Sequence, residues 1–127
     1  MFSCLGTAQT TIINAALEPE VLDLIDILQK MGADIAIKNV ATIVINGVQT
    51  LHPVSHTIIP DRLEAGALLA AAAITGGSIT ISNAQADHMD IFLEKLSAMG
   101  HLIKTPLSHP GTQGISITAT QHPVALS

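Results

Sequence analysis

Side chains with chemistry to offer are few in this sequence, and the clearest groups of them are acidic. Glu18 and Glu20 lie on either side of a proline, and residues 61–64, Asp-Arg-Leu-Glu, follow a second proline. Carboxylates act as general acids or bases, or orient the hydroxyl groups and cations of a substrate. The same positions suit a helix start, where Asp61 would be an N-cap and the two glutamates would face the positive end of the helix dipole. Both interpretations stay open for the five candidates, which are Glu18, Glu20, Asp61, Arg62 and Glu64.

The other residue types that bind metals or react with substrates form no recognisable site. Cys4 is the only cysteine, and no Lys, Arg or His precedes Lys30 to activate its thiol, so we expect a core residue. Only His52 and His56 have a helical i, i+4 spacing, and the proline between them disfavours a helix, so we predict no metal site. Gly76-Gly77 lacks the lysine of a phosphate-binding loop and indicates the end of a helix. No cofactor is expected.

The composition excludes several classes of protein. The 127 residues have a formal net charge of −5, no Trp or Tyr and two Phe. We therefore predict no nucleic-acid partner, which would need a basic patch or stacking aromatic side chains. An apolar fraction of 48% excludes disorder. The apolar run 67–74 is too short to span a membrane, and the N-terminus lacks the basic segment of a signal peptide, so we expect a cytoplasmic protein with an aliphatic core.

The elements that must position the acidic groups recur in the chain. Residues 8–14, Ala-Gln-Thr-Thr-Ile-Ile-Asn, align with residues 77–83, Gly-Ser-Ile-Thr-Ile-Ser-Asn. The apolar residues of 21–32 then match those of 89–100, with the i, i+3, i+4, i+7 spacing of an amphipathic helix. Both of these segments end in Met-Gly, and glycine suits the left-handed residue that follows a helix. Each copy is therefore predicted to contain a strand followed by a helix.

Two further strands are predicted after the helix in each copy. In the first copy they span 34–38 and 42–48, with a turn signal at Asn46-Gly47. In the second copy they span 102–105 and 114–118, and a Ser-His-Pro-Gly loop separates them. The sequence thus predicts an α/β fold of the α+β type, built from repeats.

The second copy has an additional helix that the first copy lacks. Residues 62–75 are rich in Ala and apolar on nearly every side, which is typical of a helix at the centre of a fold. Only Met1–Thr7 precede the first strand of copy one, so that copy is expected to be truncated, leaving part of the apolar stripe of helix 18–31 uncovered. Residues 51–60 contain two prolines and are expected to be extended.

Two blocks of sequence carry a resemblance to a known family. The first is Asn-Ala-Ala-Leu-Glu-Pro-Glu-Val-Leu-Asp-Leu at 14–24, with Met-Gly-Ala-Asp-Ile at 31–35. The second is Ile-Pro-Asp-Arg-Leu-Glu-Ala-Gly at 59–66. Together they resemble the UDP-N-acetylglucosamine enolpyruvyl transferase (UDP-N-acetylglucosamine 1-carboxyvinyltransferase) family. The resemblance covers nearly the whole chain and departs from the family pattern at Leu17, usually basic, and at Ala67, usually Thr. It implies an internal fragment of a longer enzyme.

The resemblance implies a fold and a division of the chain. The family fold is an inside-out α/β barrel with two lobes, and this chain would supply roughly two of its six repeat units, the first truncated. Residues 1–50 would belong to one lobe, residues 51–60 would cross between lobes, and residues 61–127 would belong to the other. A substrate cleft lies between the lobes. The resemblance places Asp61 in a catalytic role and Glu18, Glu20, Arg62 and Glu64 in the substrate cleft.

The resemblance also implies a reaction. The family transfers the enolpyruvyl group of phosphoenolpyruvate to the 3-hydroxyl of UDP-N-acetylglucosamine, a step of peptidoglycan precursor synthesis that serves cell wall biogenesis, cell shape and cell division. The chain lacks the family's Gly-rich, Arg-bearing loop with its reactive cysteine, so we expect it to be inactive alone and to need the rest of the same enzyme chain. Two alternatives remain. One is a fragment of another superfamily enzyme, such as 5-enolpyruvylshikimate 3-phosphate synthase or an RNA 3′-phosphate cyclase. The acidic net charge disfavours the RNA enzyme. The other is a non-catalytic structural domain.

Overall fold

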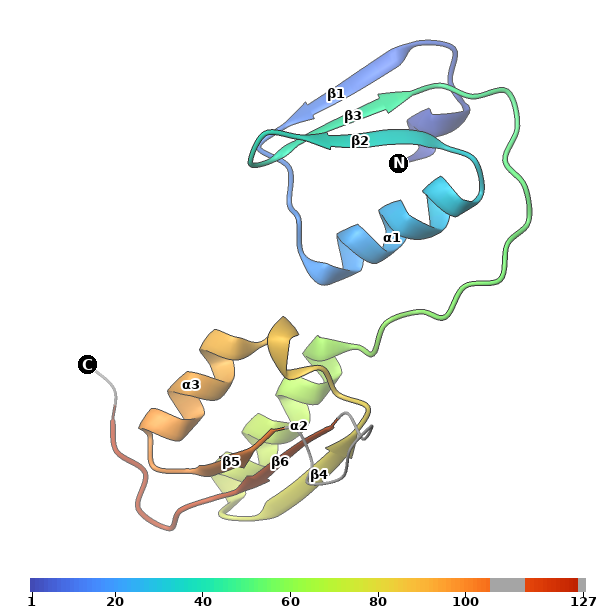
Figure 1. The fold of residues 1–127 in the computed structure, drawn as a ribbon. Coiled ribbons are helices and arrows are strands. Elements are labelled where there is room, and N and C mark those ends of the chain that lie inside the picture. The colour runs from blue at the N-terminus through green and yellow to red at the C-terminus, as the bar shows by residue number, and fades with distance from the viewer. Residues whose placement is uncertain (106–113, 126–127) are drawn as a thin grey trace. The chain divides into compact units, whose positions relative to one another are not determined.

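The computed structural model describes residues 1–105 and 114–125, which divide into two compact units. Unit 1 is Met1–Ile59 and unit 2 is Pro60–Ser127. Each unit contains a three-stranded antiparallel sheet with helical segments packed against it (Figure 1). The Ser-His-Pro-Gly loop of the sequence prediction lies outside the described residues.

Unit 1 follows the predicted order of strand, helix, strand, strand. After a short 3-10 turn, η1 (Phe2–Leu5), come β1 (Gln9–Ile13), α1 (Pro19–Lys30), β2 (Asp34–Lys38) and β3 (Thr42–Asn46). The strand order is β1-β3-β2, and Ile43 of the central strand pairs with Ile12 on one side and Ile37 on the other. The helix begins at a proline because the first turn needs no hydrogen bond from that nitrogen.

The core of unit 1 lies between the sheet and α1. Ile43 and Ile45 of β3 are 2% and 0% exposed, and they pack with Ile25 of α1. Cys4 belongs to the same buried cluster, which confirms the prediction of a core cysteine. Three consecutive residues of β3, Ile43, Val44 and Ile45, are buried, whereas burial in α1 follows one face of the helix. Other apolar side chains of α1 remain accessible, including Leu22 at 41% and Leu24 at 44% exposure.

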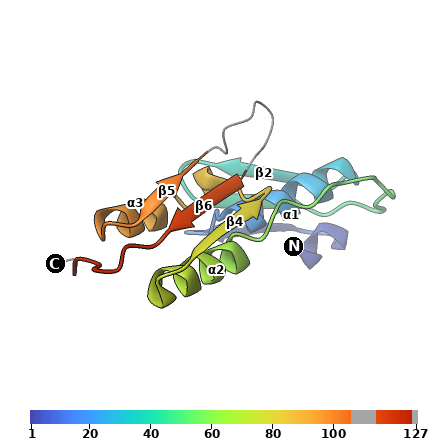
Figure 2. The same cartoon turned by 90° about the horizontal axis from the view of Figure 1, so that it is seen from below.

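Unit 2 repeats this arrangement and adds the Ala-rich helix. Its elements are α2 (Arg62–Thr75), β4 (Ser78–Ser82), the 3-10 turn η2 (Ala86–His88), α3 (Asp90–Ala98), β5 (Leu102–Lys104) and β6 (Gly114–Thr118). Figure 2 shows β6 between β4 and β5, which is the order β4-β6-β5 of the sheet. Among the described residues, no helix combines the length and the apolarity that crossing a bilayer requires.

Both helices of unit 2 pack on the same face of its sheet. Ile115 and Ile117 of β6 are almost fully buried, and their cluster includes Leu69 of α2 and Leu93 of α3. Leu69 is 0% exposed, but Leu63, Leu68 and Ile74 of α2 are 68%, 42% and 85% exposed. Only one face of the Ala-rich helix is therefore packed in unit 2, which differs from the central helix that its composition predicts. The small residues of α2 let its backbone approach the sheet closely, and Ala65 and Ala72 are buried there.

The repeat extends to backbone conformation. Asn14 and Asn83, which align in the sequence, both have positive φ, 54° and 62°, directly after the first strand of each unit. The aligned Gly32 and Gly100 have φ of 100° and 95° after α1 and α3. Asn tolerates the left-handed region better than most residues, and glycine enters it at no steric cost. The repeated residues therefore mark two backbone reversals that each unit requires.

One predicted turn was wrong. Asn46-Gly47 forms no hairpin; β3 ends at Asn46, two residues earlier than expected. The reversal between β2 and β3 lies at residues 39–41, where Asn39 has a φ of 54°. Gly47 instead lies against the backbone of Gly6. Glycine is required at position 47 because a Cβ there would overlap that backbone, and not because the chain turns.

We expect His101→Ala to destabilise unit 2. His101 is 3% exposed, and its Nδ1 accepts a hydrogen bond from the backbone N–H of Thr120 at 3.1 Å. The alanine variant would remove the partner of that N–H and empty the space of the ring, so the free energy of unfolding should fall by about 1–3 kcal/mol. Urea denaturation followed by circular dichroism measures this loss. The exposed His122→Ala is the control, and equal stability of the two variants would contradict the prediction.

Candidate functional site

Asp61 marks the start of α2 and caps it. Its Oδ1 accepts hydrogen bonds from the backbone N–H groups of Leu63 at 2.8 Å and Glu64 at 3.1 Å. These are donors that the first turn of a helix leaves without an intrahelical partner. The predicted N-cap role of Asp61 is therefore present in the structure. Both bonds go to Oδ1, so the cap does not require the second carboxylate oxygen, and the side chain is exposed.

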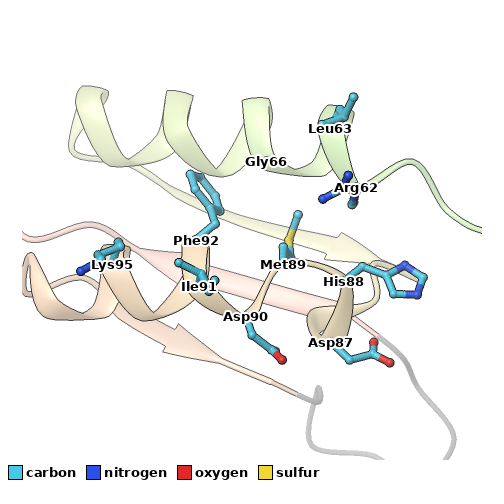
Figure 3. A pocket seen from close by; sticks show the side chains of 10 residues that line it. All are labelled: Arg62, Leu63, Gly66, Asp87, His88, Met89, Asp90, Ile91, Phe92 and Lys95. Atoms are coloured by element: carbon cyan, nitrogen blue, oxygen red, sulfur yellow. The ribbon is translucent and has the colours of Figure 1, made fainter. Parts of the chain in front are cut away.

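An open cavity of about 850 Å³ adjoins the same end of α2. Figure 3 shows the side chains of Arg62, Met89 and Phe92 directed into the space between α2 and α3. The cavity combines an apolar surface with charged groups of both signs, and it lies entirely within unit 2. Its lining residues are Arg62, Leu63, Gly66, Asp87, His88, Met89, Asp90, Ile91, Phe92 and Lys95.

His88 introduces an unusual feature to this cavity. Its Nδ1 is buried and has no hydrogen-bond partner among residues 1–105 and 114–125. Buried polar atoms are nearly always paired with protein or water, so an orphaned ring nitrogen marks a place where a further polar group would be favourable. Arg62 contributes a planar guanidinium, a side chain suited to carboxylate or phosphate groups. The apolar lining and the guanidinium of Arg62 suit a group with an apolar part and an anionic end.

The sequence identified only part of this cavity. Arg62 was a candidate, whereas His88, Phe92 and Lys95 were not. The run Asp-His-Met-Asp at 87–90 was a signal, because it concentrates three polar side chains where α3 begins. The contribution of Lys95 depends on which face of α3 turns toward α2, and the sequence alone does not specify this.

Glu18 and Glu20 lie together at the start of α1. Glu18 is the residue before the helix, and its carbonyl oxygen accepts hydrogen bonds from Val21 and Leu22. Its side chain forms no capping bond, and both glutamates are exposed. Their negative charges interact favourably with the positive end of the dipole of α1, which stabilises the helix by about 0.3–1 kcal/mol for each charge at such surface positions. This pair belongs to unit 1, whereas Asp61, Arg62 and Glu64 belong to unit 2.

No group of three or more His, Cys, Asp or Glu side chains suited to a metal ion occurs within residues 1–105 and 114–125. Cys4, the potential nucleophile of the sequence, is 3% exposed in the core of unit 1. The ionisable groups at the start of α2 and in the adjoining cavity are carboxylates, a guanidinium, an ammonium and an imidazole.

Comparison with known proteins gives consistent matches along nearly the whole chain. The family model described as EPSP synthase (3-phosphoshikimate 1-carboxyvinyltransferase) matches residues 1–125. The UDP-N-acetylglucosamine 1-carboxyvinyltransferase of Myxococcus xanthus (strain DK1622) is 42% identical over 129 residues, which cover 97% of this chain and 31% of that protein. The protein of the same name from Vesicomyosocius okutanii is 50% identical over 105 residues, covering 83% of this chain and 25% of the relative.

A solved structure also resembles this chain. The enolpyruvyl transferase NikO from Streptomyces tendae matches with a TM-score of 0.72 and 25% sequence identity, over 94% of this chain and 28% of that protein. The chain therefore spans between a quarter and a third of the length of these relatives.

Proposed function

The chain belongs to the EPSP synthase family of carboxyvinyltransferases, and on that premise we propose that it is part of a UDP-N-acetylglucosamine 1-carboxyvinyltransferase. The reaction would move the enolpyruvyl group of phosphoenolpyruvate to the 3-hydroxyl of UDP-N-acetylglucosamine and release phosphate. The observation that supports this acceptor most strongly is the 42–50% identity to enzymes of that name. The proposed setting is peptidoglycan precursor synthesis in the cytoplasm, serving cell wall biogenesis, cell shape and cell division.

The proposed architecture is the two-lobed, inside-out α/β barrel of enolpyruvyl transferases. Residues 1–50 would be a truncated repeat unit of one lobe and residues 61–127 a repeat unit of the other, with residues 51–60 crossing between them. The partners would be the two substrates and the rest of the same enzyme chain. The internal repeat supports this proposal, because each unit has the same strand order with the central strand last in sequence.

The cationic and the acidic site residues would have different roles. Arg62 would bind a phosphate or carboxylate group of a substrate, since a guanidinium forms paired hydrogen bonds to such groups. Asp61 would orient a hydroxyl group or a cation through the carboxylate oxygen that the cap does not use. Glu18, Glu20 and Glu64 would add negative charge around the cleft. None of these roles needs a metal or a cofactor.

A second acceptor, shikimate 3-phosphate, follows from the description of the matching family model. A chimera distinguishes the two acceptors. In it, this chain replaces the matching 129-residue segment of the Myxococcus xanthus enzyme. We expect phosphate release from phosphoenolpyruvate with UDP-N-acetylglucosamine and none with shikimate 3-phosphate. The opposite preference would overturn the proposed acceptor, and a folded but inactive chimera would favour a structural role.

The 127-residue chain alone should release no phosphate above background. It contains one Arg and four Lys, few cations for two anionic substrates, and its single cysteine is buried. Stabilising the charge that develops in a transferred phosphate usually needs several preorganised donors. The assay uses chain purified free of host transferase, with the active chimera as the positive control. Acceptor-dependent turnover by the chain alone would contradict the prediction.

A further inference from the structure

The segment that leads from β3 to α2 is held against α1 by a histidine. His56 has a side chain only 5% exposed, and its Nε2 lies 3.0 Å from Oδ1 of Asp23, which is 14% exposed. The two residues are 33 positions apart in the sequence. At this distance Nε2 must carry the proton and donate it to the carboxylate, in a hydrogen bond strengthened by the negative charge.

The other ring nitrogen of His56 meets two groups of opposite charge. Nδ1 lies 3.5 Å from Oδ2 of Asp26 and 3.4 Å from Nζ of Lys30, and these two side chains form an ion pair with each other. In the neutral ring Nδ1 is an acceptor, and Lys30 can donate to it. In the charged ring Nδ1 carries a proton, and Asp26 can accept it. Both protonation states of His56 therefore find a partner on α1.

The rest of the segment has one earlier fixed point. The backbone N–H of His52 donates to the carbonyl oxygen of Met31 at 2.8 Å, and Leu51 packs against the core of unit 1. Residues 53–55 are exposed and have no regular structure. After His56, only the four residues 57–60 precede the cap residue Asp61.

We propose that His56 is a positioning residue that docks the segment between β3 and α2 on α1 through its contacts with Asp23, Asp26 and Lys30. Its docking leaves residues 57–60 between His56 and Asp61. Without it, the eight residues 53–60 would separate the contact at His52 from Asp61. An extended residue spans at most about 3.3–3.6 Å, so release of His56 would roughly double the distance that the segment before Asp61 can span. The docking is independent of the proposed reaction, because cleavage of the chain reports it without turnover.

Limited proteolysis of the chain tests the docking. In His56→Ala, we expect cleavage within residues 53–58 by a protease of broad specificity to accelerate at least tenfold, while the cores of both units stay protected. Asp23→Ala should produce a similar acceleration, and the double variant should be no faster than His56→Ala, because one contact is lost in all three. His52→Ala, which removes an exposed side chain of the same segment, is the control. Wild-type cleavage in both His56→Ala and Asp23→Ala would overturn the proposal.

Discussion

Asp61→Asn, in a complete transferase that contains this segment, should lower kcat at least tenfold while the melting temperature stays nearly constant. Asn caps a helix about as well as Asp, and its side-chain oxygen can accept the same bonds from Leu63 and Glu64. The substitution therefore removes the charge of Asp61 and keeps the start of α2. A tenfold loss corresponds to about 1.4 kcal/mol of transition-state stabilisation.

Two further variants make this test specific. Asp61→Ala removes both the charge and the cap, so it should lose turnover and also about 0.5–2 kcal/mol of stability. Glu94→Gln removes a charge from an exposed position of α3 outside the candidate site, and it should change neither quantity. Steady-state kinetics and thermal melts of the three variants provide the comparison. A kcat equal to that of the unmodified enzyme in Asp61→Asn would leave Asp61 as a helix cap with no part in catalysis.

Gly47→Ala should unfold unit 1 and spare unit 2. A Cβ at position 47 would overlap the carbonyl oxygen of Gly6, and it would lie 2.5 Å from the carbonyl carbon of Gly6 and 3.1 Å from the nitrogen of Thr7. All three are backbone atoms, so no side-chain rotation relieves the clash. The adjacent hydrogen bond from Val48 N–H to the carbonyl of Cys4, 2.8 Å long, would be broken as the chains separate. We expect a loss of about 3 kcal/mol or more, a large part of the net stability of a small domain.

The matched control for this prediction is another glycine-to-alanine change. At Gly66, inside α2, an added Cβ would have its nearest neighbours, Met89 Cε and Phe92 Cε1, at 3.9 Å. Alanine is also the better helix former, so Gly66→Ala should be neutral or stabilising by up to about 1 kcal/mol. Amide signals in nuclear magnetic resonance spectra distinguish the two units. If Gly47→Ala kept dispersed signals for unit 1 and unfolded with the same free energy as the unsubstituted chain, the close approach of Gly47 to Gly6 would be refuted.

The secondary structure and the repeat were predictable from the sequence because their signals are local. Alternating burial in β4, the apolar stripe of α1 and the glycines after α1 and α3 all depend on residues close together in the chain. The cap at Asp61 is equally local, since its acceptors and donors lie within three residues. The resemblance of residues 14–24 and 59–66 to carboxyvinyltransferases was likewise visible in the sequence, and the family match confirms it.

Contacts between residues distant in the chain were decided only by the tertiary structure. Asn46-Gly47 has the composition of a hairpin turn, yet the close approach of Gly6 explains the glycine. The burial of His56 beside Asp23 depends on how the segment between β3 and α2 packs on α1, and the two residues are 33 positions apart. The cavity at the start of α2 joins Arg62 to Lys95 through the packing of two helices. Local periodicity specifies which face of an element is apolar, whereas the partner of that face depends on packing across the whole unit.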